Sequence, residues 1–347
     1  MSRWFASLFV LLFSLCPALH AQAAPLHLVQ KDAMPPSVQG KFDHLGIDLR
    51  GHRLFAAAEA AHQVLVFDLE TGKYLRSIDS IPIPHAILVR QDLNRIYITD
   101  GGDGAVRIYD GKTYRLLKTV PLKVDTDSIG YDPQSKYLYV DNGGGDAHES
   151  YSMLSVIDTT KGTKVADIRI DGDTLEAMAL EKGSERMFVN DASENKVVVL
   201  DRKTRQIVTV WPVTLGKRNV AMALDEAHHR LFVACRDGKL VIFNTQSGKE
   251  LQALTIGRGV DDAAFDPATG RLYVQCGTDG STWIYQEKGP SQFTLVSSVF
   301  EGTNARNSLL APQSNRYYVI VPPASGPGFV AVFSTAAVTS GGAQTSE

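Results

Sequence analysis

The chain has 347 residues, of which 44% are hydrophobic and 21% are charged, so it is long enough to bury a large core. Its 35 basic and 38 acidic residues give a net charge of −3 at pH 7, which argues against the strongly basic surface that binding to a phosphate backbone requires. Three cysteines are too few for a disulfide scaffold.

Residues 1–23 have the pattern of a secretory signal peptide. Arg3 is the only charged residue before an apolar run that ends at Leu15, and Ala21-Gln22-Ala23 supplies a small–any–small cleavage site. The run is too short to cross a bilayer, and no later stretch approaches the ~20 apolar residues of a transmembrane helix. We therefore expect an exported protein, periplasmic or secreted, that begins near Ala24 and has no membrane span.

The first predicted strand after this segment has no partner nearby in the sequence. Leu26–Lys31 alternates apolar and polar residues, and Pro35-Pro36 ends it. The strand precedes the first complete repeat of the chain, so it must pair with an element far away in the sequence.

The rest of the chain repeats one phrase of short strands and Gly/Asp turns. Each copy is anchored by a residue pair that ends in an aromatic residue, and successive aromatic residues are 42, 42, 49, 44, 41 and 45 residues apart. The seven pairs are Leu54-Phe55, Ile96-Tyr97, Leu138-Tyr139, Met187-Phe188, Leu231-Phe232, Leu272-Tyr273 and Tyr317-Tyr318. A period of roughly 40–50 residues with short strands is typical of a β-propeller blade.

We therefore predict an all-β fold, a seven-bladed β-propeller of four-stranded blades. It occupies residues 24–335 as one domain, and residues 336–347 form a disordered tail. The last repeat lacks an outer strand, so the N-terminal strand is expected to pair with it. That pairing closes the ring and removes two open sheet edges.

A ring of ionisable residues is predicted at one mouth of the central channel. The position twelve residues before each anchor aromatic marks the start of an inner strand, and inner strands line the channel of a propeller. The seven positions are Asp43, His85, Asp127, Glu176, Val220, Asp261 and Arg306. Polar neighbours add to them: His44, Ser128, Asn219, Asp262 and Asn307. Two interpretations stay open, a water-filled channel and a ligand-binding funnel.

The loops between the second and third strands are expected at the same mouth, because the second strand runs antiparallel to the first. They carry acidic residues and histidines: Glu59, His62, Asp103, Asp191 and Glu194. The longest loop, Asn142–Ser152, carries Asp146, His148 and Glu149 and accounts for the 49-residue step. It is either a lid over the funnel or a surface variation.

Cys235 and Cys276 each lie three residues after an anchor aromatic, in adjacent blades. Adjacent blades splay apart by more than the roughly 7 Å between Cα atoms that a disulfide tolerates. We therefore expect two separate thiols.

The repeat resembles the YVTN-type propeller family, because Leu138-Tyr139-Val140-Asp141-Asn142 is similar to the motif that gives the family its name. More specifically, the mature chain is similar to the secreted YncE-like proteins. The resemblance implies the propeller fold without implying a reaction. It also implies nucleic-acid binding as an alternative function, because single-stranded DNA binding has been attributed to a relative; the acidic composition argues against it.

Glu176, Asn219 and Asp261 lie in three consecutive blades and offer the oxygen ligands that Ca²⁺ prefers. This set resembles the calcium site in the channel of lactonase-type six-bladed propellers. With His85 or His148 as a base, a Ca²⁺-dependent hydrolase or lyase is therefore an alternative function.

The leading prediction is a monomeric, non-enzymatic scaffold that binds a small ligand or a protein partner at the charged funnel. No G-x-S-x-G elbow, phosphate-binding loop or C-x-x-C pair is present in the sequence, so no catalytic residue is assigned.

Overall fold

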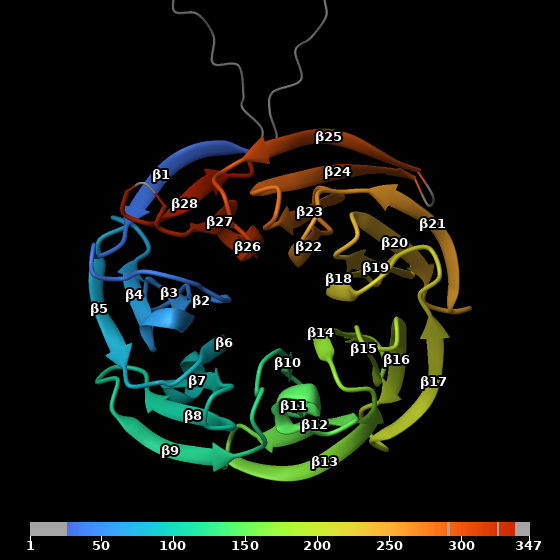
Figure 1. The fold of residues 1–347 in the computed structure, drawn as a ribbon, viewed down its shortest axis with the longest axis horizontal. Helices are drawn as coiled ribbons and strands as arrows, with labels where there is room; N and C mark the ends of the chain where they lie inside the picture. Colours follow the sequence, from blue (N-terminus) through green and yellow to red (C-terminus); the bar gives the residue numbers. More distant parts are fainter. Residues whose placement is uncertain (1–25, 290–291, 325, 337–347) are drawn as a thin grey trace, which may run out of the picture.

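The computed structural model describes residues 26–289, 292–324 and 326–336, and these form seven four-stranded antiparallel sheets around one axis (Figure 1). The predicted seven-bladed all-β propeller is therefore confirmed. The predicted signal peptide lies outside the described residues, as does the predicted tail beyond Ala336. No helix among the described residues is long and apolar enough to cross a membrane.

Each blade contributes four strands, numbered outward from the axis. Blade 1 contains β2 (Leu45–Asp48), β3 (Arg53–Ala58), β4 (Gln63–Asp68) and β5 (Tyr74–Asp79), and blade 2 contains β6 (Pro84–Arg90), β7 (Arg95–Asp100), β8 (Ala105–Asp110) and β9 (Leu116–Pro121). Blade 3 contains β10 (Ile129–Asp132), β11 (Tyr137–Gly143), β12 (Tyr151–Asp158) and β13 (Thr163–Asp171), and blade 4 contains β14 (Leu175–Leu180), β15 (Arg186–Asp191), β16 (Lys196–Asp201) and β17 (Gln206–Pro212).

The remaining blades follow the same order. Blade 5 contains β18 (Asn219–Asp225), β19 (Arg230–Cys235), β20 (Lys239–Asn244) and β21 (Lys249–Thr255), and blade 6 contains β22 (Val260–Asp266), β23 (Arg271–Cys276), β24 (Ser281–Gly289) and β25 (Gln292–Phe300). Blade 7 contains β26 (Ser308–Ala311), β27 (Arg316–Val321) and β28 (Phe329–Ser334). Short 3₁₀ helices interrupt the loops: η1 (Glu59–Ala61), η2 (Gln91–Leu93), η3 (Gly144–Ala147) and η4 (Pro312–Ser314).

The ring closes through the N-terminal strand, as predicted. β1 (His27–Ala33) lies antiparallel along β28 as the outer strand of blade 7, with His27 opposite Ser334 and Ala33 opposite Phe329 (Figure 1). The backbone N–H of Met34 extends this contact by donating to the carbonyl of Gly328 at 3.0 Å. The seven sheets of the described residues are thus joined into one closed ring.

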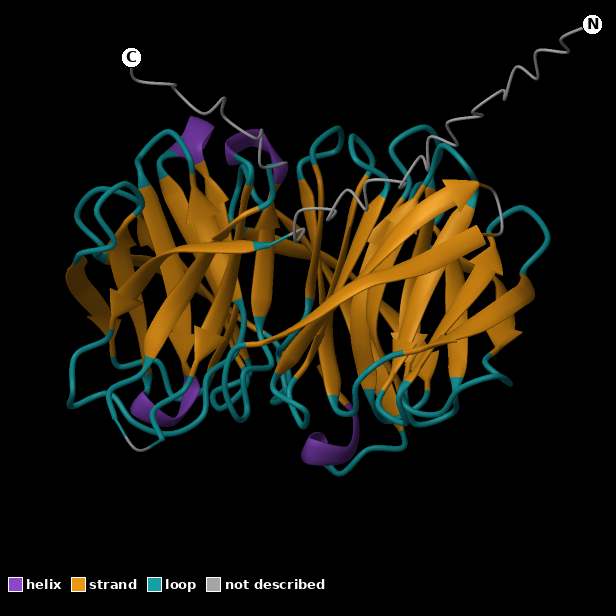
Figure 2. Ribbon diagram, turned by 90° about the horizontal axis from the view of Figure 1, so that it is seen from above, coloured by secondary structure: helices purple, strands orange, loops and turns teal. Residues whose placement is uncertain are grey.

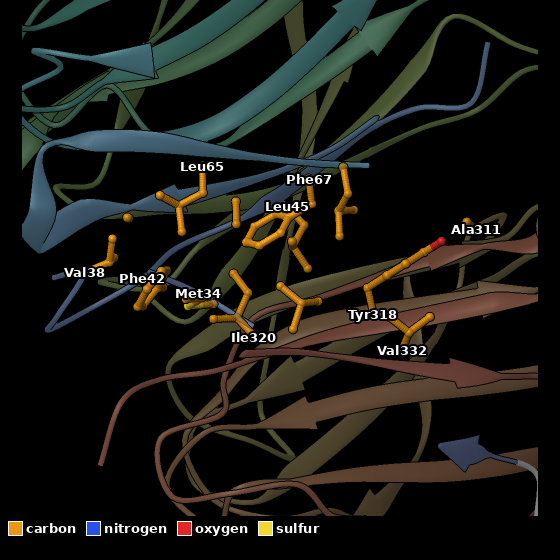
Figure 3. Packing of buried hydrophobic residues seen from close by; sticks show 14 residues of the cluster. Met34, Val38, Phe42, Leu45, Leu65, Phe67, Ala311, Tyr318, Ile320 and Val332 are labelled. Carbon is orange, nitrogen blue, oxygen red and sulfur yellow. The ribbon is translucent and has the colours of Figure 1, made fainter. Parts of the chain in front are cut away.

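The hydrophobic core lies between blades. In the described part of the chain there are seven buried apolar clusters, one at each junction between neighbouring blades. Figure 3 shows the junction of blades 1 and 7, where Leu65 and Phe67 face Tyr318 and Ile320. The middle strands are apolar on both faces because each face packs against a different blade.

The strands run between two rims of loops (Figure 2). The chain enters each blade at the inner strand, so the starts of all seven inner strands lie at the same rim. The turns from the second to the third strand return to that rim, because neighbouring strands are antiparallel. Residues far apart in the sequence are thereby brought to one end of the axis.

Cys235 and Cys276 are both free and fully buried. Cys235 packs in the cluster between blades 4 and 5, whereas Cys276 packs in the cluster between blades 5 and 6. Since a whole sheet separates the two clusters, the expectation of two separate thiols agrees with the structure.

Candidate functional site

A cavity of about 230 Å³ lies at the rim where the inner strands begin, and residues from all seven blades line it. The seven residues at the predicted ring positions are all among them: Asp43, His85, Asp127, Glu176, Val220, Asp261 and Arg306. Backbone pairing is irregular at several of these positions, since the register between inner and anchor strands shifts at His85, Glu176, Val220 and Asp261. Residues that stand at the same distance in sequence from their anchor aromatic residues therefore lie together around one cavity.

The predicted polar neighbours divide into two groups. His44 and Ser128 line the cavity, while Asp262 and Asn307 hold residues that do. Asn219 differs, because its side chain is fully buried and its Nδ2 donates to Asn190 Oδ1 at 2.8 Å and to the carbonyl of Lys196 at 2.9 Å.

The cavity lining carries more negative than positive groups. Seven carboxyl groups contribute: Asp43, Glu59, Asp125, Asp127, Asp146, Glu176 and Asp261. Five basic side chains oppose them, namely Lys41, His44, His85, Arg236 and Arg306. Acidic side chains therefore outnumber basic ones in the lining.

Asp43 is the most densely contacted acid of the cavity. Its Oδ2 pairs with Nδ1 of His85, and its Oδ1 accepts a hydrogen bond from Nδ2 of Asn307 at 3.1 Å. Nε2 of His44 lies 3.5 Å from the same Oδ1. Burial acts to raise the pKa of Asp43, but the charges of His44 and His85 outweigh it and lower that pKa to about 2. Asp43 is therefore ionised.

The pKa values of His44 and His85 are raised, whereas that of Asp43 is lowered. Burial acts to lower the pKa of His85, but Asp127 and Asp43 outweigh it and raise that pKa to about 9. Burial likewise opposes protonation of His44, yet Asp43 and Asp262 raise its pKa well above the ordinary value. Asp262 acts directly, since its Oδ1 lies 3.3 Å from Nδ1 of His44.

Three other carboxyl groups of the cavity have raised pKa values. Burial, followed by repulsion from neighbouring carboxylates, raises the pKa of Asp125 to about 6 and that of Asp261 to about 6. The pKa of Glu176 rises to about 8 through burial, against the opposing charge of Arg236. These acids are poised to ionise when a positive ligand arrives.

Asp141 lies behind this cluster, on β11. It is 2% exposed and neither carboxyl oxygen has a hydrogen-bond partner. Burial first, and then Asp127, raise its pKa well above the ordinary value. At the equivalent position of blade 4, Asn190 donates its amide to the carbonyl of Val220 at 2.9 Å. The carboxyl group of Asp141 can donate a hydrogen bond, as the amide of Asn190 does, only when it is protonated.

The three cations of the lining have different partners. Nη2 of Arg236 donates to Asp261 Oδ1 at 3.1 Å and lies 3.8 Å from Glu176 Oε1. Nζ of Lys41 lies 2.7 Å from Glu59 Oε2. The guanidinium of Arg306 has no hydrogen bond or ion pair with any residue that the structure describes.

The loops contribute fewer cavity residues than predicted. Glu59 and Asp146 line the cavity, the latter from η3 in the longest loop. Asp103 instead pairs with Arg107, and Glu149 pairs with Lys123. The longest loop therefore presents one acid, Asp146, to the cavity.

Three charged lining residues were missed from the sequence, namely Lys41, Asp125 and Arg236. Arg236 could have been found, because it stands four residues after Phe232, as Glu59 stands four residues after Phe55. Lys41 and Asp125 each lie two residues before a ring position and were overlooked for that reason.

The donor groups that lie close together differ from the predicted calcium set. Glu176 and Asp261 line the cavity, whereas Asn219 is not among its lining residues and its Nδ2 donates to residues of blade 4. Two other sets of possible metal ligands have their ligand atoms within 4.8 Å of one another. One is Asp43 with His44 and Asp127, and the other is Asp43 with Glu59 and His85.

Comparisons with known proteins support the propeller and the resemblance. No protein-family model matches the chain. The chain is 32% identical over 113 residues to a protein named "Uncharacterized protein YncE" in Salmonella typhi and in Salmonella typhimurium. That segment covers 33% of this chain and 32% of each relative, so the chain spans about a third of the length of the curated relatives it matches. The predicted similarity to YncE-like propellers is thereby confirmed over that segment.

Two solved structures share the fold. A chain of hydrazine synthase from Kuenenia stuttgartiensis superposes with a TM-score of 0.72 at 17% identity, over 87% of this chain and 98% of that one. A chain of the mitotic checkpoint complex superposes with a TM-score of 0.70 at 13% identity, over 95% of this chain and 98% of that one. At such identities the likeness extends to the fold alone.

Proposed function

We propose that this protein is an exported, non-enzymatic scaffold that binds a small, positively charged ligand in the cavity at the start of the inner strands. The observation that carries the proposal is the lining itself, in which seven carboxyl groups face five basic side chains, namely one lysine, two arginines and two histidines. The export part of the proposal depends on the pattern of residues 1–23.

The raised pKa values of Glu176 and Asp261 support a cationic ligand. Each acid stays partly protonated because its negative charge is poorly solvated and has neighbours of the same sign. A cation in the cavity supplies the missing counter-charge, so binding is coupled to proton release. Arg306 provides a separate contact for a negative group of a zwitterionic ligand.

The test is ligand-induced stabilisation of the purified protein. A panel of diamines, amino acids and divalent cations is added, and the melting temperature is measured. We expect at least one member of the panel to raise the melting temperature of the wild type. The double variant Glu176→Gln/Asp261→Asn should not show this rise, because it replaces two carboxyl groups by amides of similar size that cannot ionise.

Asp225→Asn is the matched control, because Asp225 ends β18 at the opposite rim. This variant should respond to the panel as the wild type does. The proposal is rejected if no member of the panel stabilises the wild type, or if the double variant responds equally well.

A metal-dependent hydrolase remains a second candidate, favoured by the two donor sets around Asp43. Hydrolysis of a lactone or ester that stops on addition of a chelator would establish it. The nucleic-acid alternative gains no support, because an acidic lining repels phosphate groups.

A further inference from the structure

We propose that the cavity holds one divalent transition-metal ion of the zinc type, bound by Asp43, His44 and Asp127. The proposal rests on the proposed function and names the class of cation. Each of the three residues lines the cavity, and their ligand atoms lie within 4.8 Å of one another. The set combines one imidazole with two carboxylates.

The spacing of the donors fits a small metal ion. His44 Nε2 and Asp43 Oδ1 are 3.5 Å apart, too far for a good hydrogen bond. Two ligands of a tetrahedral zinc, with bonds of about 2.0–2.1 Å, lie about 3.3–3.4 Å from each other. The two atoms therefore already lie close to the separation that a shared ion requires.

A second observation comes from Asp127. Its side chain is 28% exposed, but Oδ1 itself is buried without a hydrogen-bond partner among the described residues and lies 3.8 Å from Nδ1 of His85. A carboxylate oxygen inside a protein is stabilised when a hydrogen-bond donor or a cation lies against it. An ion between Asp127, Asp43 and His44 satisfies this oxygen.

The residues around the set are arranged as metal sites usually are. Nδ1 of His44 faces Asp262 Oδ1 at 3.3 Å, which leaves Nε2 as the ligand atom. His85 holds the other oxygen of Asp43, Oδ2, and so orients Oδ1. The alternative set of Asp43, Glu59 and His85 is less suitable, because His85 Nδ1 is already engaged by Asp43 and its Nε2 abuts Gly101.

The ligand types select the metal. Ca²⁺ takes six to eight oxygen ligands, whereas Zn²⁺ and similar ions accept imidazole and carboxylate together in a set of three or four. With three protein ligands, at least one coordination position remains for water or for a small ligand in the cavity. The site thus differs in both residues and metal from the calcium set of Glu176, Asn219 and Asp261.

The experiment uses tag-free protein, treated with a chelator and dialysed. Zn²⁺, Mn²⁺ and Ca²⁺ are each titrated by calorimetry, and bound metal is measured after gel filtration. We expect one Zn²⁺ per chain, little Ca²⁺, and a visible Co²⁺ spectrum of mixed nitrogen and oxygen ligands. His44→Gln and Asp127→Asn should each weaken Zn²⁺ binding by more than about 100-fold, and Asp262→Asn by about 10- to 100-fold.

His228→Gln is the matched control. His228 lies with Asp225 and Glu287 in another mixed set whose ligand atoms are within 4.8 Å of one another, away from the cavity. This variant should keep the full Zn²⁺ stoichiometry. Loss of Zn²⁺ in His228→Gln together with retention in His44→Gln would overturn the assignment.

Failure of the metal site is distinguishable from failure of the cavity. If wild-type protein binds no divalent ion, yet an organic cation stabilises it and the Glu176→Gln/Asp261→Asn variant loses that response, the metal proposal is rejected and the proposed function survives. The Co²⁺ spectrum is recorded on wild-type protein, so its absence counts against the site even where a variant fails to fold.

Discussion

Glu301 illustrates, at the scale of one residue, how burial controls a carboxyl group outside the cavity. Its Oε1 accepts a hydrogen bond from Oγ1 of Thr282 at 2.7 Å, whereas its Oε2 is buried without a partner. Burial, opposed by the bonds from Thr282 and Gln275, raises the pKa of Glu301 to about 7. The folded protein therefore holds this proton more tightly than the unfolded chain does.

The first prediction concerns the pH dependence of stability. Because the pKa of Glu301 is raised on folding, the unfolded chain loses this proton first as pH rises from about 4.5, and stability falls until about pH 7. Glu301→Gln removes this loss, so it should be more stable than the wild type by roughly 2–3 kcal/mol at pH 8. Urea unfolding at pH 4.5 and pH 8 measures the difference, and an equal gain at both values would contradict it.

At the scale of one element, β1 carries the closure of the ring. It pairs with β28 and also contacts the turn of blade 1, where Gly72 has φ +67°. A Cβ on Gly72 would lie 2.0 Å from Oδ1 of Asp32 on β1, so only glycine allows this approach. The strand is thus held by the blade on each side of the closure.

The second prediction is the effect of removing β1. A chain that begins at Met34 should lose on the order of 5 kcal/mol of unfolding free energy, from about 1 kcal/mol for each ladder hydrogen bond that is no longer formed. It also leaves the edge of β28 open to association with other chains. A chain that begins at Leu26 is the control. Equal urea midpoints, with both proteins eluting at the same volume in gel filtration, would refute a role for β1 in closure.

At the scale of the whole molecule, stability is shared among blades. Each of the seven apolar clusters in the described residues lies between two neighbouring blades. Opening one blade therefore exposes two clusters, and the ring offers no free end from which unfolding can start. We expect the blades to unfold together.

The third prediction uses the two buried thiols as reporters. Burial raises the pKa of Cys276 to about 12 and that of Cys235 further, so neither reacts as a thiolate in the folded state. In a chain that begins at Leu26, and so lacks Cys16, both thiols should react with a thiol reagent at the same rate. That rate should follow global unfolding as urea increases. Faster labelling of one thiol, measured in Cys235→Ser and Cys276→Ser variants, would show that blades open separately.

The sequence predicted the ring of cavity residues because two physical constraints fix it. The hairpin of inner and anchor strands, including a register shift at ring positions such as Val220 and Asp261, sets the distance from each anchor aromatic to the start of its inner strand, and the repeat applies this distance seven times. Arg306 and Asp43, 263 positions apart, are placed in one cavity by that rule.

Asn219 shows where the rule stops. It stands one position before Val220, and successive side chains of a strand point to opposite faces. Its amide therefore enters the junction with blade 4 and not the cavity. Residues on turns, such as Lys41 and Arg236, follow no ladder, so their position depends on local backbone geometry that periodicity does not encode.

The pairing of β1 with β28 has a consequence for the order of synthesis. The ribosome makes His27 almost first among the described residues and Ser334 almost last, yet these two lie opposite each other. A nascent chain therefore has to keep its first strand unpaired until translation of nearly all other strands is complete. Closing so long a loop is slow, and it leaves an edge exposed in the meantime. A chaperone that covers this exposed edge would therefore act on the newly synthesised chain, before β1 pairs with β28.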